Sequence, residues 1–476
     1  MSVSATVERG AERLPLALVI VALVAAAINL PGPNGLLVLL CVAVFLAGAA
    51  LLWRPGEPPI FLFIFGYQWL QASVSAFHSN WLGIDVSDYS PYGGENKRAI
   101  VLTLVGLLAL AAGMRAGAGP PAARANESAR RVALSQPVER WFWLYCVSSI
   151  VAFAALFVAV LAPGFSQPLI ALAALKWAFF LMFAYASFVR GAAANLLFAA
   201  TFLFELGASL GGFFSDFKTV MYFTMFAMAM AGIRLRLRAA VSAALLAVLI
   251  VASGVVWTAV KDQYRQFASG GSDSQAVLVD VGSRLSMLAA LTGNLDQLAI
   301  ETAADNLVRR ISYVELLGVV LVRVPDLMPY EYGANLLDAV SRPFMPRVLF
   351  SDKSEIDDTL RTSLYTGGIS GAYRSTSISL GYMTDLYIDF GQYLIIPVIG
   401  LLGYLYGRIY SGLIGARRSS PLLGSAIASS ILVQAALLEV SLPKLIGGVA
   451  VSVLIAALFM TYVAPKWLPW LADPSE

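Results

Sequence analysis

Long hydrophobic runs alternate with short polar segments along most of this chain. A transmembrane helix needs roughly 20 consecutive apolar residues, and twelve runs in the sequence approach or reach that length. The first run resembles a signal peptide, but because other spans follow it at once we expect it to be retained as the first helix. We therefore predict twelve spans, at residues 14–30, 35–53, 59–77, 99–116, 141–162, 168–189, 195–214, 219–233, 239–260, 392–410, 421–440 and 445–464.

The composition agrees with this pattern. Of the 476 residues, 59% are hydrophobic and only 13% are charged, whereas a soluble domain carries about 25% charged residues. We predict an all-α polytopic membrane protein. Its first nine spans occupy residues 1–260, one large outer loop occupies 261–391, and the last three spans occupy 392–476.

Arginine and lysine residues are distributed unequally between the two sides that these spans define. With the N-terminus in the cytoplasm, sixteen of them fall in cytoplasmic segments and four in the short outer loops, as the positive-inside rule requires. We predict that both termini and the loop at 117–139 are cytoplasmic and that 261–391 faces outward. The 117–139 loop is rich in Ala, Pro and Arg, which predicts a flexible segment with no chemistry of its own.

The large outer loop has two different halves. Its first half has apolar residues at helical spacing, interrupted once at Thr292-Gly293-Asn294, which predicts amphipathic helices on the outer membrane face. Its second half, 325–391, is dense in Pro, Gly, Tyr and Ser, and we expect it to be irregular. A long loop on a helical scaffold is a common location for a binding or catalytic site.

The sequence lacks the motifs of most familiar hydrolases and nucleotide-using enzymes. It contains no P-loop, no G-x-S-x-G, no H-E-x-x-H and no paired zinc-ligand spacing. The triplet Asp389-Phe390-Gly391 matches a kinase motif, but the partner motifs of a kinase are missing. The two cysteines, Cys41 and Cys146, lie in apolar runs and offer neither a disulfide framework nor a metal site. We expect no metal ion, no other cofactor and no nucleic-acid partner.

The outer loop also holds a set of cations suited to an anionic ligand. Arginine's planar guanidinium matches phosphate oxygens and stays charged at any relevant pH, so the set suits a lipid pyrophosphate. Alternatively, these cations pair with the loop's carboxylates or contact anionic headgroups, and both explanations stay open. We assign Lys261, Arg265 and Lys353 to substrate binding. The full set is Lys261, Arg265, Arg309, Arg310, Arg323, Arg342, Arg347, Lys353, Arg361 and Arg374.

Charges and aromatic rings near the spans add further candidates. Asp216 and Lys218 lie in a short, otherwise apolar hairpin and are candidates for substrate binding. Lys176 and Glu205 lie inside predicted spans, where an unpaired charge is costly, so we expect them either to pair or to line a cavity. Tyr373 belongs to a set of aromatic residues that suit either stacking on sugar rings or an interfacial belt. These are residues 365, 373, 382, 387, 390 and 393.

Three segments resemble the Wzy-type bacterial polysaccharide polymerases, the oligosaccharide repeat-unit polymerases. They are VKDQYRQF at 260–267, a segment from RRISYVELL to FSDKSE at 309–355, and YRSTSISLGYMTDLYIDFGQYLIIPVIGLLGYLYG at 373–407. In that family an arginine begins the central helix of the loop, and Arg310 matches it. A Pro-Arg segment followed by a lysine matches Arg347 and Lys353, with five intervening residues instead of four. The family's Asn-Phe-Gly is replaced here by Asp389-Phe390-Gly391, which adds a carboxylate.

The resemblance implies a metal-independent glycosyltransferase of the multi-spanning GT-C kind in a bacterial inner membrane. Two undecaprenyl-pyrophosphate-linked oligosaccharides would bind on the outer side, and a sugar hydroxyl of the incoming unit would attack the anomeric carbon of the growing chain. Arg310, Arg347 and Arg374 would stabilise the leaving pyrophosphate, and a carboxylate such as Asp389 would take the hydroxyl proton. The implied partners are membrane lipids, a chain-length regulator and a flippase of the same pathway.

Three other functions stay open at this point. An O-antigen ligase shares the substrate type and layout, but that family relies on a histidine in its large outer loop, and this loop has none. A polysaccharide-precursor flippase or transporter would be expected to show internal repeats and interrupted helix pairs, which the sequence does not clearly show. A structural partner of the polysaccharide machinery would not need the cations.

Overall fold

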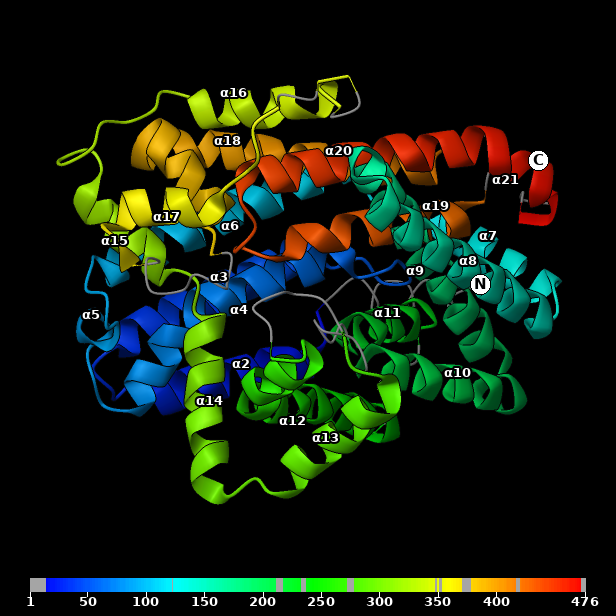
Figure 1. Cartoon of the computed structure of the whole chain (residues 1–476), viewed down its shortest axis with the longest axis horizontal. Coiled ribbons are helices and arrows are strands. Elements are labelled where there is room, and N and C mark those ends of the chain that lie inside the picture. The colour runs from blue at the N-terminus through cyan, green and yellow to red at the C-terminus, as the bar shows by residue number, and fades with distance from the viewer. Residues whose placement is uncertain are drawn as a thin grey trace, which may run out of the picture. The chain divides into compact units, whose positions relative to one another are not determined.

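The computed structural model describes residues 14–121, 123–210, 217–232, 237–271, 278–346, 349–350, 353–369, 378–416 and 420–471. Every regular element within these ranges is a helix (Figure 1), which confirms the all-α class. The chain forms two compact units: unit 1 is Met1–Met182 with Ser312–Glu476, and unit 2 is Phe183–Ile311. The predicted outer loop at 261–391 is therefore divided between the two units.

A helix lies at each of the twelve predicted spans. Three of these are shorter apolar helices at Leu16–Asn29, Ala194–Ser209 and Pro421–Ala436, and two more are α11 (Phe217–Met230) and α12 (Leu237–Ala268). The remaining seven, among the described residues, are long and apolar enough to cross a membrane. They are α3 (Gly35–Leu52), α4 (Ile60–Trp81), α6 (Asn96–Ala118), α8 (Val138–Leu161), η1 with α9 (Pro163–Arg190), α18 (Tyr382–Ile414) and α20 with its continuation (Leu442–Trp467).

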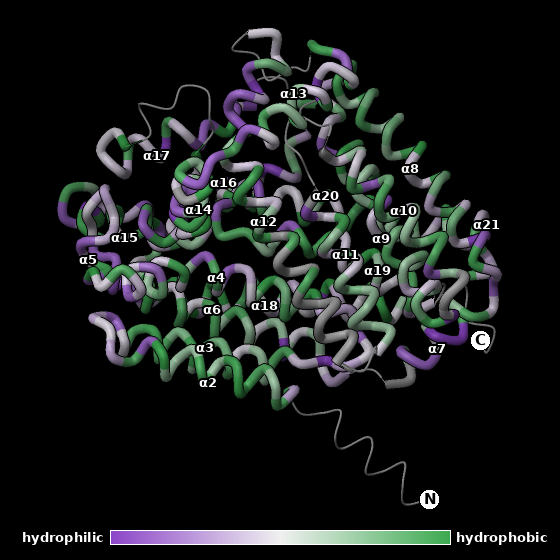
Figure 2. Tube along the Cα trace, turned by 90° about the horizontal axis from the view of Figure 1, so that it is seen from below, coloured by the Kyte–Doolittle hydropathy of each residue, from purple (hydrophilic) through white to green (hydrophobic). Residues whose placement is uncertain are grey.

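These helices are consistent with a membrane protein, while the number of spans and their orientation stay predictions. Hydrophobic residues dominate α2 (Leu16–Asn29) and α3, whereas hydrophilic residues are frequent around α5 (Val86–Tyr89) and α15 (Glu315–Arg323), as Figure 2 shows. The division of the chain into a hydrophobic scaffold and more polar connecting segments is therefore visible in three dimensions.

Glycines allow α6 and α18 to pack closely along their length, side by side in Figure 1. A Cβ on Gly113 would lie 2.0 Å from the carbonyl oxygen of Gly400, and one on Gly403 would lie 2.2 Å from the oxygen of Leu110. No larger side chain fits at such distances. Small residues that let two backbones approach are a general means of packing helices within membranes, and this pair forms the centre of unit 1.

Side chains from the middle of α4 support a break in a neighbouring helix. α19 (Pro421–Leu432) continues as a 3₁₀ turn, η4 (Val433–Ala436), and becomes irregular before α20 (Leu442–Leu458) begins. Gln68 donates to the carbonyl oxygen of Ala435 at 2.6 Å and accepts from the Tyr382 hydroxyl at 2.8 Å. Gln71 accepts from the backbone N–H of Leu438 at 2.8 Å. Backbone groups freed within a membrane must be bonded by protein in this way.

The predicted flexible loop at 117–139 is largely a helix, so that expectation was wrong. α7 (Ala123–Ser135) packs against α19 and buries Ala129, Val132 and Ala133. The chain before it is held by Arg54, which donates to the carbonyl oxygen of Gly119 at 2.7 Å. The apolar residues of α7 occur at helical spacing, and this amphipathic pattern stabilises the helix despite its many charged residues.

The two halves of the outer loop are more alike than the sequence indicates. The first half contains α13 (Val281–Gly293) and α14 (Gln297–Ile311), and the break at Thr292-Gly293-Asn294 is confirmed. The chain breaks again before α15. The second half, expected to be irregular, contains α16 (Ala334–Ser341), η2 (Arg342–Phe344), α17 (Asp358–Thr366) and the first turns of α18. Its helices were missed because their stabilising contacts lie elsewhere in the chain, as described below.

Candidate functional site

Three of the predicted ligand-binding cations converge within unit 2. Lys261 and Arg265 are one turn apart on α12, which places them on one face of that helix. Arg310 lies in the last turn of α14. The two helices pack closely, because a Cβ at Gly254 of α12 would lie 3.3 Å from a methyl group of Leu307 on α14. The packing of α12 against α14 therefore brings Lys261 and Arg265 near Arg310, although about 45 residues separate Arg265 from Arg310 in the sequence.

Electrostatic repulsion shows that the three cations are near one another. Burial lowers the pKa of Lys261 most, repulsion from Arg310 lowers it further, and Asp262 opposes the shift while Arg265 adds to it. Burial likewise lowers the pKa of Arg265, followed by repulsion from Arg310, with Asp262 again opposing. Like charges that are partly removed from water destabilise one another. A ligand with several negative charges would reverse this repulsion, so the cluster is chemically suited to a polyanion.

The orientation of α12 is set by its apolar side chains. Val260 and Tyr264 are buried beside Lys261 and Arg265 in the sequence, and the Tyr264 ring packs edge-on against Trp257 at 5.4 Å between centroids. Because Trp257 also belongs to α12, it is the burial of Val260 and Tyr264 that defines the inward face of the helix. Lys261 and Arg265 are consequently half-buried, whereas Arg310 is exposed, so an incoming ligand can reach the cluster from the Arg310 side.

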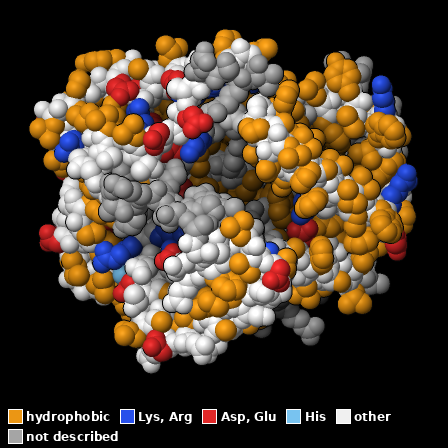
Figure 3. All heavy atoms as spheres, in the orientation of Figure 1, with side chains coloured by type: hydrophobic (Ala, Val, Ile, Leu, Met, Phe, Trp, Pro, Cys, Tyr) orange, Lys and Arg blue, Asp and Glu red, His pale blue; other side chains and the backbone are white. Residues whose placement is uncertain are grey.

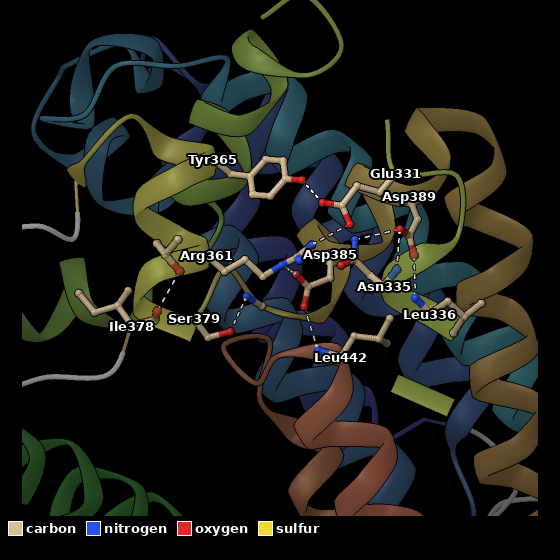
Figure 4. Close-up of polar contacts among 12 residues, drawn as sticks. Glu331, Asn335, Leu336, Arg361, Tyr365, Ile378, Ser379, Asp385, Asp389 and Leu442 are labelled. Carbon is tan, nitrogen blue, oxygen red and sulfur yellow. Dashed lines mark hydrogen bonds and ion pairs between the residues drawn. The ribbon is translucent and has the colours of Figure 1, made fainter. Parts of the chain in front are cut away.

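Unit 1 contains a second charged region, built around the first turns of α18 (Figure 4). The carboxylate of Asp389 accepts hydrogen bonds from the backbone N–H of Asn335 at 3.1 Å, from the Asn335 side chain at 2.9 Å and from the backbone N–H of Leu336 at 2.8 Å. These donors form the first turn of α16, whose own N-cap residue is Gly333. Asp389 therefore caps α16 from another helix and complements its dipole.

Asp385, which lies one turn before Asp389 on α18, likewise caps the N-terminus of α20. It accepts from the backbone N–H of Leu442 at 2.9 Å and from Arg361 Nε at 3.1 Å. The two aspartates share one face because they are four residues apart. Beyond them α18 kinks at Gly391, whose φ of +67° favours glycine. Both carboxylates are nearly inaccessible to solvent, and their oxygens are occupied by donors.

Arg361 of α17 lies at the centre of this network. Its Nη2 is 3.7 Å from Glu331 Oε2, and its guanidinium lies 5.2 Å from the centroid of the Tyr365 ring. The Tyr365 hydroxyl donates to Glu331 Oε1, as Figure 4 shows. Burial, the largest influence, lowers the pKa of Arg361, but the combined attraction of Asp385 and Glu331 raises it overall. Burial raises the pKa of Tyr365, and its bond to Glu331 adds to this.

The remaining predicted site residues occupy varied positions. Lys353 donates to the carbonyl oxygens of Arg342 at 2.7 Å and of Met345 at 3.0 Å, so it stabilises the chain around η2. Lys218 is exposed near the start of α11. Among the described residues no group of His, Cys, Asp or Glu is placed to hold a metal ion. Outside the described residues lie Asp216, Arg347, Tyr373 and Arg374.

Most of the aromatic candidates for sugar stacking have structural contacts instead. Tyr365, Tyr382 and Tyr387 are buried, and the Tyr387 hydroxyl donates to the carbonyl oxygen of Val324 at 2.9 Å. Tyr393 is 80% exposed and keeps its ring available. Because a sugar must reach the face of a ring to stack on it, only Tyr393 of these four can serve this role without a rearrangement.

Lys176 lies among aromatic rings of unit 1. Its ammonium is 4.9 Å from the Trp177 ring centroid and 6.0 Å from that of Tyr145, which are favourable cation–π distances. Glu205 is buried in unit 2. Their pairing stays a prediction, as does a role in lining a cavity.

Sequence reasoning missed the network of Glu331, Arg361, Tyr365 and Asp385 as a unit. Arg361 and Tyr365 were each noted, but neither was linked to a partner. One signal was available: Asp385 and Asp389 are four residues apart in the otherwise largely apolar stretch YMTDLYIDF. Two carboxylates on one face of such a helix indicate that specific hydrogen-bond donors from other parts of the fold contact them. Which donors these are depends on tertiary contacts.

A family model described as "Domain of unknown function (DUF8712)" matches residues 122–472, which covers most of the chain and includes both charged regions. No curated protein and no solved structure matches the chain.

Proposed function

The chain belongs to the DUF8712 family, and we propose that it is a polysaccharide polymerase acting on lipid-linked oligosaccharides. It would transfer a growing glycan from undecaprenyl pyrophosphate to an incoming lipid-linked repeat unit. The convergence of Lys261, Arg265 and Arg310 in unit 2 carries the proposal. These residues belong to two separate segments that resemble the Wzy-type polymerases, and the proposal rests equally on that resemblance.

The chemistry of the leaving group explains why three cations would be needed. In the proposed reaction the bond between the anomeric carbon and the pyrophosphate oxygen breaks, and a new bond forms between that carbon and the acceptor oxygen. The electron pair of the broken bond stays on the pyrophosphate, so negative charge increases there in the transition state. Fixed cations at that point stabilise the transition state electrostatically. Arg310, which is exposed, is suited to bidentate contact with phosphate oxygens.

The proton of the acceptor hydroxyl must pass to a base, and Asp389, where the resembled family has Asn, is the candidate carboxylate. Its three hydrogen bonds to α16 use both carboxylate oxygens. Accepting a proton would therefore loosen the N-terminus of α16. We assign pyrophosphate binding to the unit 2 cluster, and Arg347 and Arg374 stay candidates that the resemblance alone implies.

A reconstituted assay tests this proposal directly. Purified protein in liposomes would receive undecaprenyl-pyrophosphate-linked repeat units, and products would be separated by length. The expected result is a ladder of glycans with release of undecaprenyl pyrophosphate. A single transfer to a different lipid acceptor would favour the O-antigen ligase alternative, and the absence of any new glycosidic bond would contradict both.

A flippase is the second candidate, because one observation favours it. The break between α19 and α20 and the kink of α18 at Gly391 place non-helical backbone beside candidate spans. Discontinuous helices of this kind form substrate sites in transporters. Translocation of a fluorescent lipid-linked oligosaccharide without a change in its length would support this function over polymerisation.

A further inference from the structure

The short helix α17 has its polar face turned inward and its apolar face turned outward. Asp358 and Tyr365 are 4% and 3% exposed, whereas Leu360 and Leu364 are 69% and 57% exposed. A helix on a water-soluble protein shows the opposite arrangement. The apolar residues are four apart and therefore form one stripe.

Specific contacts hold α17 in this orientation. Asp358 pairs with Lys444 of α20 at 2.6 Å, and Arg361 pairs with Asp385 of α18. Thr362 donates to the carbonyl oxygen of Ile378 at 2.8 Å. With three successive positions of its polar face bonded to the body of unit 1, α17 cannot turn its leucines inward without breaking those bonds.

The preceding segment shows the same arrangement. Leu337, Val340 and Phe344 occur at spacings of three and four residues and are exposed, Leu337 to 72% and Phe344 to 79%. The opposite face, with Asn335 and Ala339, is buried. α16 packs against α18 and α20, two of the candidate membrane spans, and runs alongside them in Figure 1.

Two cations of this segment, Arg342 and Lys353, are bonded within it. Arg342 pairs with Asp338 at 2.6 Å and also donates to the carbonyl oxygen of Ser354 at 3.1 Å. The ammonium of Lys353 donates to two carbonyl oxygens of the same segment. Internal satisfaction of polar groups is the condition for placing a segment against lipid. Hydrophobic side chains among acidic and basic ones are visible on this part of the surface in Figure 3.

The apolar stripe is also continuous with the candidate lipid-facing surface of α18. Asp389, which caps α16, precedes Gly391 by two residues, and Tyr393 and Leu394 are exposed just beyond that kink. From residue 392 to 414 α18 is about 34 Å long, enough to cross a hydrocarbon core of about 30 Å. The N-terminus of α16 is thus fixed to one end of a membrane-length helix, where amphipathic helices commonly meet the headgroup region.

We propose that α16, η2 and α17 lie against the phospholipid bilayer, with Leu337, Val340, Phe344, Leu360 and Leu364 in contact with lipid. This part of the predicted outer loop is then a lipid-contacting segment rather than a water-exposed loop. Lipid is the occupant that fits, because the stripe joins the exposed apolar surface of a candidate span and Arg342 and Lys353 are bonded within the segment. The inference does not depend on the enzymatic proposal.

Site-directed spin labelling of the full chain in nanodiscs tests it. Cys41 and Cys146 would be replaced by alanine, and single cysteines introduced by Leu337→Cys, Leu360→Cys and Leu364→Cys. Glu355→Cys, at an exposed polar position in the same segment, is the water-facing control, and Leu401→Cys, exposed on α18, is the lipid-facing control. The melting temperature of each labelled protein would be compared with that of the cysteine-free parent.

The expected result is that labels at the three leucine positions collide with oxygen several-fold more than with a nickel chelate, as at position 401, with the opposite ratio at 355. Labels that match position 355 would overturn the proposal. Two further results would also overturn it: dipolar broadening between labels, which would indicate a second copy, or protection from both reagents, which would indicate a covering protein segment. Because all three positions are exposed, the labels should leave folding intact.

Discussion

The two charged regions of this protein use the same residue types in opposite ways. In unit 1, Arg361 lies between Asp385 and Glu331, and Lys444 pairs with Asp358. In unit 2, Arg310 repels both Lys261 and Arg265, and Asp262 opposes that repulsion. Attraction raises the pKa of Arg361, whereas burial and repulsion lower the pKa of Arg265.

This difference between the two regions distinguishes charges that stabilise the fold from charges that are suited to bind a ligand. A cation that is matched by carboxylates within the fold contributes to the arrangement of the helices that carry them. Cations that repel one another cost stability, and ionisable groups perturbed in this way are found more often at functional sites. We therefore expect substitutions in unit 1 to act on stability and substitutions in unit 2 to act on turnover.

The largest expected effect is loss of stability after Arg361→Met. The substitution would leave Asp385, whose side chain is 2% exposed, without its cation, and breaking a buried pair typically costs about 3–5 kcal/mol. Unfolding in mixed detergent micelles would measure the change. Adding Asp385→Asn should recover part of the loss, because the amide is uncharged and still accepts from Leu442. If Arg361→Met were as stable as the parent, the paired charges of unit 1 would not stabilise the fold, and the proposed difference between the units would be wrong.

The next effect is on catalysis and concerns Arg265 and Arg310. Arg310→Ala should lower the rate of polymerisation by about 100- to 1,000-fold, or roughly 2.7–4 kcal/mol in the activation free energy. Arg310→Lys should remain impaired because it loses the planar guanidinium. Arg265→Ala should slow the reaction without lowering stability, because it relieves repulsion.

Arg309→Ala is the matched control for this test, since Arg309 is the exposed neighbour of Arg310 on α14. Its rate should stay within about twofold of the parent, as expected for a surface cation worth roughly 0–1 kcal/mol. Equal losses at 309 and 310 would mean that the effect comes from general surface charge, and normal rates for Arg265→Ala and Arg310→Ala would place the function elsewhere.

A smaller effect is expected at Asp389. Removing a helix cap costs about 0.5–2 kcal/mol, so Asp389→Ala should lower stability by that amount and speed amide hydrogen exchange in α16. Asp389→Asn should cost less because the amide oxygen still accepts from the backbone. If Asp389→Asn instead abolishes turnover with stability unchanged, Asp389 acts in proton transfer.

The sequence predicted the positions of the scaffold helices well because long apolar runs are a local signal. A helix lies at each of the twelve predicted runs. It also assigned Lys261 and Arg265 to substrate binding, but their place on one face follows from the helix α12, and their approach to Arg310 depends on the packing of α12 against α14. The caps formed by Asp385 and Asp389, and the inverted orientation of α17, were not predictable, since each depends on partners more than 20 residues away.

The smallest expected effect is a pH dependence that reports, without any substrate, the burial of Lys261 and its repulsion by Arg310. Because the folded-state pKa of Lys261 lies below its ordinary value of about 10.4, the unfolded chain binds more protons between the two values. The free energy of unfolding should therefore rise with pH through that window as Lys261 loses its charge. Lys261→Met removes this group, so the difference between the parent and this variant isolates its contribution from other groups that titrate there.

Pyrophosphate added at neutral pH should stabilise the parent more than Lys261→Met. A parent and a variant with identical pH profiles and identical responses to pyrophosphate would show that the three cations do not act as a cluster.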